Sequence, residues 1–376
     1  MTREGIRREA RTSDEFSWAY AAGRVKIVEK ELLSAAELRQ LAGAKSLEAS
    51  IAALRETYYG RYLAGMAGAP AASFDLPLQK ALRDAYESVL GYAGEPLAVT
   101  VFRARHDFHN VKVAVKDRFL GIPGEEEALS IVGNLGVLGM DELLEKTRTA
   151  RPGDKGARAG GIDFTGRVDL LVEERAIAGT YLAAGELIER ERSGNSPVAL
   201  ALLADSFVDA AYYGWAAAAL KRLGYPELRR FFTAEIDLTN LRMAFRACRQ
   251  GIPDSLFARV VLGGGEVGAK DVRSAYGQGP ERVENLYAGT AWGSLATSGA
   301  ALLERKAALT SWERECDNAL MRVYRRARYV SLGPEPVIGY LLAKEAEVRN
   351  LRVVLSGKES QVPASEILER LRETYV

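Results

Sequence analysis

The chain has 376 residues, of which 48% are hydrophobic and 27% are charged, a composition typical of a soluble globular protein with more than one domain. Its 51 lysines and arginines nearly balance its 50 aspartates and glutamates, which argues against a nucleic-acid-binding protein or a polybasic membrane anchor. Two distant cysteines, Cys248 and Cys316, fit a reducing compartment, and we find no run of about 18 apolar residues that would predict a membrane span.

The first half of the chain predicts a tail, a helix and a loop. Residues 1–15 are polar and lack the apolar core of a secretory signal, so we expect a tail there. From residue 24 to residue 43, apolar residues recur at spacings of three and four, which predicts an amphipathic helix. Residues 146–161 are rich in glycine and in basic residues, which predicts an exposed loop.

Helical periodicity continues in the second half. Residues 207–224 are rich in alanine and end with Gly224 shortly before Pro226, a pattern that predicts a helix stopping at this glycine. Alternating strand patterns are hard to find, and the Asn-Gly and Asp-Gly signals of tight hairpins are absent from the sequence. We therefore predict an all-α protein.

A short pattern recurs three times, as DFHNVK at 107–112, DLTNLR at 237–242 and EVRNLR at 347–352. When the copies are aligned on the asparagine, an acid lies three residues before it and a base two residues after it. The members of this motif are Asp107, Asn110 and Lys112; Asp237, Asn240 and Arg242; and Glu347, Asn350 and Arg352. A proline follows each asparagine by thirteen residues, at Pro123, Pro253 and Pro363. The asparagines are 130 and 110 residues apart, so the repeat is the size of a domain.

Each copy of the motif predicts one helix, because apolar residues one, four and five positions after the asparagine form a stripe. The acid and the asparagine share a face of that helix. Both residue types are poor in helix interiors, since their short side chains compete for backbone groups. Their recurrence therefore implies tertiary partners. We expect the asparagine to bond to the backbone end of a neighbouring helix, and the acid to pair with a basic residue or a helix N-terminus.

Two other patterns suggest chemistry. His106 and His109 lie three residues apart, a spacing that can hold a metal on a helix, but the other copies of the motif have no histidine at these positions. Gly263, Gly265 and Gly268 match the spacing of a dinucleotide-binding loop, but no convincing second strand comes after them. Since Gly133 and Gly263 both lie 23 residues after a motif asparagine, we interpret each as a turn before a helix. We predict no catalytic residue, cofactor or metal site.

The motif resembles that of the C-subunit family of prokaryotic V/A-type ATPases, whose eukaryotic counterpart is the d subunit of the vacuolar ATPase. The segment Tyr340–Lys358 carries the most specific part of this resemblance, with Glu345 beside the third copy of the motif. Tyr20, Arg24 and the segments 32–34 and 54–58 resemble the start of the family's sequence. The resemblance covers nearly the whole chain.

The resemblance implies three similar helical domains arranged as a pseudo-threefold funnel. We place them at 16–125, 126–255 and 256–376, with N- and C-terminal helices exchanged between units. It also implies a non-catalytic rotor part in the central stalk of an ATP-driven ion pump or ATP synthase, peripheral on the cytoplasmic face of the membrane. Its partners would be the central-shaft subunits on one side and the proteolipid ring on the other. The alternatives are a nucleotide-dependent enzyme that uses the Gly263 loop and a generic helical scaffold.

Overall fold

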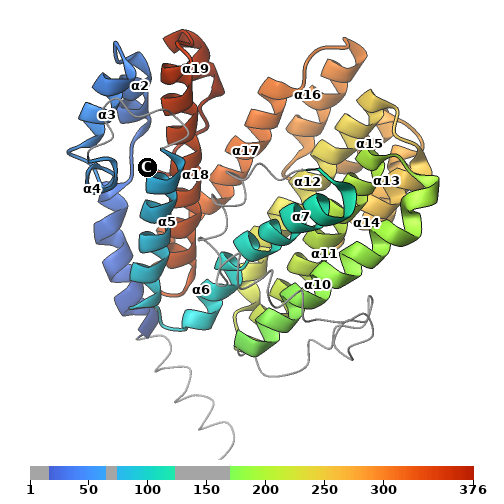
Figure 1. Ribbon diagram of the computed structural model, residues 1–376, viewed down its shortest axis with the longest axis horizontal. Helices are drawn as coiled ribbons and strands as arrows, with labels where there is room; N and C mark the ends of the chain where they lie inside the picture. Colours follow the sequence, from blue (N-terminus) through green and yellow to red (C-terminus); the bar gives the residue numbers. More distant parts are fainter. Residues whose placement is uncertain (1–16, 65–73, 123–169) are drawn as a thin grey trace, which may run out of the picture. The chain divides into compact units, whose positions relative to one another are not determined.

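The computed structural model describes residues 17–64, 74–122 and 170–376, and it describes side chains in the last range from residue 176 onward. These residues form helices joined by short connections (Figure 1), and this part of the chain contains no β-strand. The predicted all-α fold is therefore confirmed. The predicted tail at 1–15 and the predicted loop at 146–161 lie outside the described residues.

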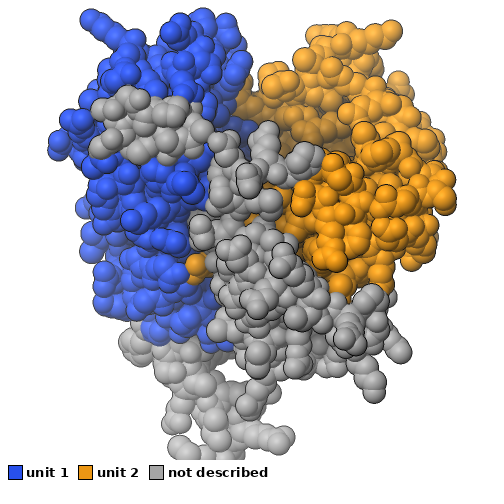
Figure 2. Space-filling model, in the orientation of Figure 1, with its two compact units in different colours: residues 1–102, 317–376 blue, residues 103–316 orange. Residues whose placement is uncertain are grey.

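The chain divides into two compact units (Figure 2): unit 1 is residues 1–102 with 317–376, and unit 2 is residues 103–316. The division falls at the end of α6 (Pro96–Arg103) and inside α17 (Thr310–Arg325). The division into three units at 16–125, 126–255 and 256–376, and their arrangement as a funnel, stay predictions. Across the described ranges, no helix is long and apolar enough to cross a membrane.

Unit 1 carries one copy of the motif, on the helix Glu335–Glu359, and unit 2 carries two copies, on the helices Arg105–Leu120 and Arg229–Gln250. Besides α6 and α17, the elements of unit 1 are η1 (Glu29–Glu31), α2 (Ala35–Gly43), α3 (Leu47–Leu54), α4 (Gly60–Leu63), α5 (Asp75–Leu90), η5 (Arg326–Tyr329), α18 (Glu335–Glu359) and α19 (Ala364–Arg370). Those of unit 2 are α7 (Arg105–Leu120), α10 (Leu170–Glu191), η3 (Arg192–Gly194), α11 (Pro197–Leu223), η4 (Pro226–Leu228), α12 (Arg229–Gln250), α13 (Asp254–Val260), α14 (Ala269–Tyr276), α15 (Pro280–Tyr287) and α16 (Gly293–Glu304). In unit 1, α18 packs against α2, α3, α5 and α19. In unit 2, α12 packs against α14, α15 and α16.

All three copies of the motif lie within single helices, as predicted: α7, α12 and α18. The apolar positions one, four and five residues after each asparagine are all buried, which confirms the predicted stripe. They are Val111, Ala114 and Val115; Leu241, Ala244 and Phe245; and Leu351, Val354 and Leu355. Pro253 and Pro363 do not close these helices but cap the start of the next ones, the short α13 and α19.

The predicted single helix at 24–43 is wrong. Residues 17–28 are helical, η1 comes next, and the backbone is extended at Leu32 and Ser34 before α2 begins. Ser34 and Glu37 form a capping box, in which each side chain bonds to the other residue's backbone N–H. This box stabilises a new helix start at Ala35, so the apolar periodicity belongs to two helices.

The predicted helix at 207–224 is part of the longer α11, which begins at Pro197 behind the cap Ser196. Its end is where the sequence predicts it. Gly224 has a φ of 89°, a left-handed conformation that favours glycine and stops the helix.

Candidate functional site: the repeated acid–asparagine motif

Asn240 lies fully buried on α12 and forms two hydrogen bonds with the main chain of Leu262. Its Nδ2 donates to the Leu262 carbonyl at 2.8 Å, and the Leu262 N–H donates to its Oδ1 at 2.9 Å. Leu262 lies two residues beyond the end of α13. An asparagine suits this position because one side chain both accepts and donates, and so satisfies both backbone groups of a single buried residue.

Asp237, one turn earlier on α12, holds the continuation of the same loop. Its carboxylate accepts the N–H groups of Glu266 at 3.0 Å and Val267 at 3.1 Å. Burial raises the pKa of Asp237, while these two backbone hydrogen bonds oppose the rise. Val267 directly precedes Gly268, the cap of α14. The acid and the asparagine together therefore fix residues 262–267 against α12.

Asn350 repeats this geometry on α18 in unit 1. Its Nδ2 donates to the Arg372 carbonyl at 3.1 Å, and the Arg372 N–H donates to its Oδ1 at 3.0 Å. Arg372 lies two residues beyond the end of α19, as Leu262 does beyond α13. In both copies the bonded residue lies 22 positions after the asparagine. The two contacts are thus equivalent in geometry and in spacing.

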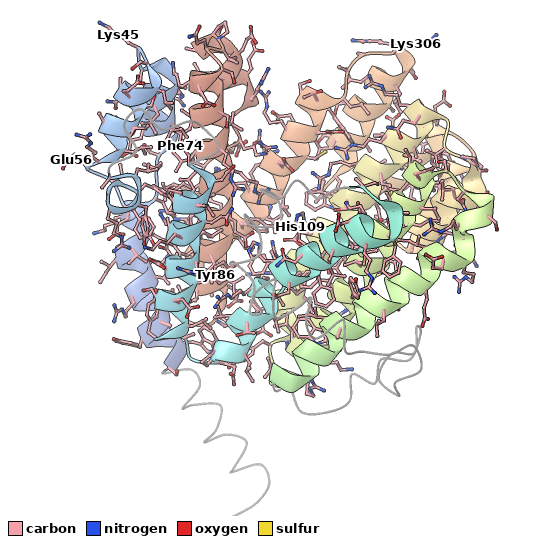
Figure 3. All side chains as sticks on the ribbon, in the orientation of Figure 1. Lys45, Glu56, Phe74, Tyr86, His109 and Lys306 are labelled. Atoms are coloured by element: carbon pink, nitrogen blue, oxygen red, sulfur yellow. The ribbon has the colours of Figure 1, made fainter. Side chains whose placement is uncertain are left out.

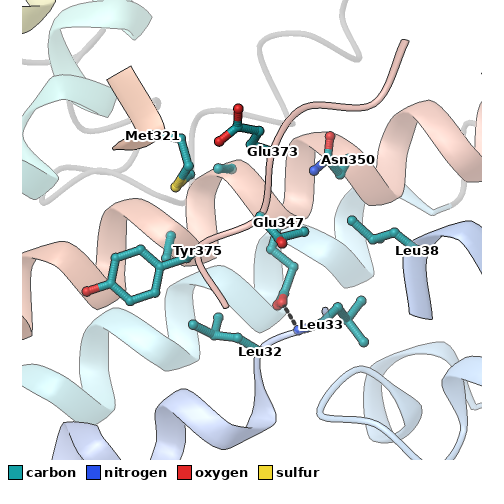
Figure 4. A pocket seen from close by; sticks show the side chains of 11 residues that line it. Leu32, Leu33, Leu38, Met321, Glu347, Asn350, Glu373 and Tyr375 are labelled. Carbon is teal, nitrogen blue, oxygen red and sulfur yellow. Dashed lines mark hydrogen bonds between the residues drawn. The ribbon is translucent and has the colours of Figure 1, made fainter. Parts of the chain in front are cut away.

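Glu347 holds a different segment of the chain, far from it in sequence. Its carboxylate accepts the N–H of Leu33 (Figure 4), the hydroxyl of Tyr59 at 2.6 Å and the ammonium of Lys344 at 2.7 Å. Leu33 directly precedes Ser34, the cap of α2. Leu33 therefore has the same position relative to α2 that Val267 has relative to α14. In unit 1 the acid and the asparagine therefore bind two segments of the chain, whereas in unit 2 they bind one loop.

The ion pair of Glu347 and Lys344 is buried, and Lys344 is fully enclosed. Two aromatic rings contact the ammonium: Lys344 Nζ lies 4.0 Å from the ring centre of Tyr58 and 4.8 Å from that of Tyr59. Burial, and then the charge of Glu347, raise the pKa of Tyr59 well above its ordinary value. The Tyr59 hydroxyl therefore stays protonated and remains a hydrogen-bond donor. These aromatic faces and the carboxylate compensate the cost of burying the charge.

The turns after α3 and α15 show that the likeness between the units extends beyond the motif. Thr57 Oγ1 donates to the Leu54 carbonyl and accepts the N–H of Tyr59. Thr290 makes the same two bonds, with Tyr287 and Trp292. A glycine comes next in both turns, where an added Cβ would collide with a backbone carbonyl. The segment that begins at α2 in unit 1 therefore corresponds to the segment that begins at α14 in unit 2.

The basic member of the motif pairs with an acid on another helix in two copies. Lys112 Nζ lies 2.5 Å from Asp209 on α11, and Arg352 Nε lies 2.6 Å from Asp75, the first residue of α5. Arg242 donates from Nε to the Leu238 carbonyl of its own helix at 3.3 Å. These pairs are partly exposed, so each contributes less than the buried contacts.

In the first copy, Asp107 and Asn110 are fully buried on α7. The residue 22 positions after Asn110 is Val132, which lies outside the described residues, as do Pro123 and Gly133. His106 is half-buried and His109 is exposed on the same helix. His109 is labelled in Figure 3. No group of three His, Cys, Asp or Glu side chains that could hold a metal occurs among the described residues.

The glycine-rich loop at 263–268 comes after helix α13 instead of the strand that a dinucleotide-binding motif requires. Its N–H groups at Glu266 and Val267 donate to Asp237, so they are occupied within the protein. A Cβ at Gly265 would lie 2.1 Å from Asp237 Oδ1. Gly265 thus allows the loop to approach the carboxylate. This structural role explains a glycine at this position without a bound dinucleotide.

Most partners of the motif could not be identified from the sequence. Leu33, Leu262 and Arg372 take part through their main chains, which carry no residue-specific signal. Lys344 offered a signal, since a lysine three residues before a glutamate on one helix predicts an ion pair. Glu345, which lies next to the third copy of the motif in the sequence, accepts a hydrogen bond from the Tyr86 hydroxyl at 2.7 Å.

Comparison with known proteins shows a family match along most of the chain. The model of the family described as ATP synthase (C/AC39) subunit matches residues 21–151 and 179–370. The chain is 25% identical to the C subunit of the A-type ATP synthase of Methanocaldococcus jannaschii over 93% of this chain and 85% of that protein. It is 26% identical to the same-named protein of Haloquadratum walsbyi over 93% and 96%. The C subunit of the V-type sodium ATPase of Enterococcus hirae is 30% identical over 41% of this chain and 47% of that protein.

Proposed function

This chain belongs to the ATP synthase (C/AC39) subunit family, and from that premise we propose that it is the non-catalytic rotor socket of a V/A-type ATPase or ATP synthase. In this role it joins the rotating central shaft to the proteolipid ring, on the cytoplasmic face of the membrane. It transmits torque and binds no cofactor of its own.

The observation that carries this proposal is that the copies of the motif on α12 and α18 hold segments of the protein together. In unit 2, four hydrogen bonds tie α12 to the loop at 262–267: Asn240 donates one and accepts one, and the Asp237 carboxylate accepts two. In unit 1, Asn350 and Glu347 tie α18 to Arg372 and Leu33. A part that transmits torque needs helices that do not slide under load, and buried two-bond contacts at fixed positions oppose sliding.

Co-purification tests the socket role directly. An affinity tag on this chain, in cells that make the whole complex, should recover the shaft subunits and the proteolipid ring from gently solubilised membranes. Because we expect polar, charge-complementary contacts with the ring, raising the salt concentration should release the ring. If neither the ring nor the shaft subunits are recovered, the socket proposal is contradicted and the generic helical scaffold becomes the better interpretation.

Rotation and nucleotide binding separate the socket from the enzyme alternative. A bead attached to this chain in the immobilised complex should rotate when ATP is added, and a stationary bead would contradict the proposal. Titration of the isolated chain with NAD or ATP in a calorimeter should produce no binding heat. Saturable heat that disappears in Gly265→Ala would support the nucleotide-dependent alternative.

A further inference from the structure

Residues 371–376, which we name the strap, follow α19 in an extended conformation and run along α18 in unit 1 (Figure 4). Side chains from neighbouring elements form hydrogen bonds with the strap backbone at four successive residues. The bonded pairs are Asn350 with Arg372, Asn318 with Glu373, Arg325 with Thr374, and Arg328 with Tyr375. The strap is thus held through its main chain, as a peptide is held in a binding groove.

Ion pairs add to the attachment of the strap. Glu373 lies 2.7 Å from Arg322 and 3.3 Å from Arg325. Arg372 lies 2.7 Å from Asp317. The side chains in these pairs are between 18% and 49% exposed, so water and dissolved salt reach them. The charged part of the attachment is therefore weak and sensitive to ionic strength.

The strap forms part of the wall of a cavity beside Glu347. The cavity has a volume of about 10 Å³, close to the size of one water molecule. Its lining includes Leu33, Glu347, Glu373, Thr374 and Tyr375 (Figure 4). The hydrogen bond between the Leu33 N–H and the Glu347 carboxylate thus borders the strap. If the strap left this wall, water would reach that bond.

The comparison with unit 2 shows why the strap can move by itself. In unit 2 the two positions beside the motif belong to one loop, 262–267, which continues into α13 at one end and α14 at the other. In unit 1 the same positions belong to Leu33 and Arg372, in segments that the chain does not join directly. One of these segments can therefore leave while the other stays in place.

We infer that the strap is a conformational switch, which detaches from α17 and α18 as a unit while the helices of unit 1 stay folded. Its detachment frees the start of α2 from Glu347, and its attachment ties α2 to α18. Higher ionic strength favours the detached state, because the ion pairs of Glu373 and Arg372 are screened. This inference does not depend on the socket role, since every contact it uses lies within unit 1.

Hydrogen exchange of the full chain tests the inference, because amides that open without global unfolding exchange faster than those of the core. Fragmentation mass spectrometry resolves single amides, and the rates are corrected for intrinsic exchange. We expect the amides of Leu33, Arg372 and Glu373 to exchange together and faster than those of α18. Glu373→Gln should accelerate all three about fivefold to tenfold, since it weakens two partly exposed ion pairs. Raising the NaCl concentration from about 0.1 M to about 1 M should also accelerate them.

Matched controls make the test specific to the strap. Glu369→Gln is the same change at an exposed position of α19 and should leave the three rates unchanged. The Leu262 and Val267 amides of unit 2 should not respond to Glu373→Gln.

Two results would overturn the inference. Strap amides that exchange as slowly as those of α18 would show that the strap opens only when unit 1 unfolds. Acceleration at Arg372 and Glu373 without any at Leu33 would show that the strap does not control the start of α2. Should Glu373→Gln fail to fold, as measured by circular dichroism, the salt series on the unchanged chain distinguishes the same outcomes.

Discussion

The two units use the same motif to hold different arrangements of chain. In unit 2, Asn240 and Asp237 bind one continuous loop, from Leu262 to Val267. In unit 1, Asn350 binds Arg372, and Glu347 binds Leu33, which is 314 positions away in sequence. The motif therefore fixes positions in space and not a particular chain connection. The same two places beside the helix are filled by one loop in unit 2 and by two chain segments in unit 1.

The largest difference should appear when the acids are removed. Glu347→Ala leaves the buried ammonium of Lys344 without its carboxylate, so we expect a loss of about 3–5 kcal/mol from the free energy of unfolding. Asp237→Ala leaves two backbone N–H groups unpaired but no buried charge, and it should cost about 1–3 kcal/mol. Urea denaturation of the full chain measures both.

A double variant separates charge from packing at the same place. Lys344→Met with Glu347→Leu removes both charges and should be less destabilised than Glu347→Ala alone. Equal losses for Glu347→Ala and Asp237→Ala would show that the ion pair makes no difference between the two copies.

Removal of the asparagines should produce a smaller difference between the two copies. Asn240→Ala leaves the buried carbonyl and N–H of Leu262 without partners, and we expect a loss of about 2–3 kcal/mol. Asn350→Ala should cost about 1–2 kcal/mol, since the Arg372 backbone is only partly buried and water can replace the side chain. Thermal unfolding of each variant against the unchanged chain provides the measurement. A larger loss for Asn350→Ala would reverse the comparison.

The glycines of the loop test how closely it must approach α12. A methyl group at Gly265 would meet the Asp237 carboxylate, so Gly265→Ala should cost about 1–2 kcal/mol. Gly263→Ala is the matched control, because nothing lies within 4 Å of its added Cβ, and its stability should change by no more than about 0.5 kcal/mol. The two variants are compared by the midpoint of urea unfolding. Equal midpoints would show that the approach at Gly265 is not tight.

The smallest and most local effect should be a change in the reactivity of the Cys248 thiol, on the motif helix α12. Burial raises the pKa of its thiol to about 11, so at pH 8 it should react with iodoacetamide about a hundredfold more slowly than an ordinary exposed thiol. Asn240→Ala should speed this reaction by loosening α12, whereas Asn350→Ala should not. Mass spectrometry measures the modification at this residue. Equal acceleration by both variants would mean that the two motif sites do not open separately.

The sequence predicted the helices that carry the motif and their buried stripes, because periodicity and recurrence are visible in one dimension. It did not predict the break before α2, although Ser34 and Glu37 have the spacing of a capping box. The bonded residues Leu262 and Arg372 could not be identified, since a backbone group carries no sign of its partner. The pairing of Glu347 with Leu33 was equally hidden, because it depends on how distant segments pack.

The contact between Glu347 and Leu33 has a consequence for the order in which the chain can fold during synthesis. Ribosomes add about 5–20 residues per second, so about 15–60 s separate the appearance of Leu33 from that of its partner. During this interval the start of α2 and the hydroxyl of Tyr59 lack the Glu347 carboxylate that later binds them. The motif of unit 2 and its loop leave the ribosome together and can close first. Molecular chaperones therefore have the longest opportunity to bind the N-terminal segment of unit 1.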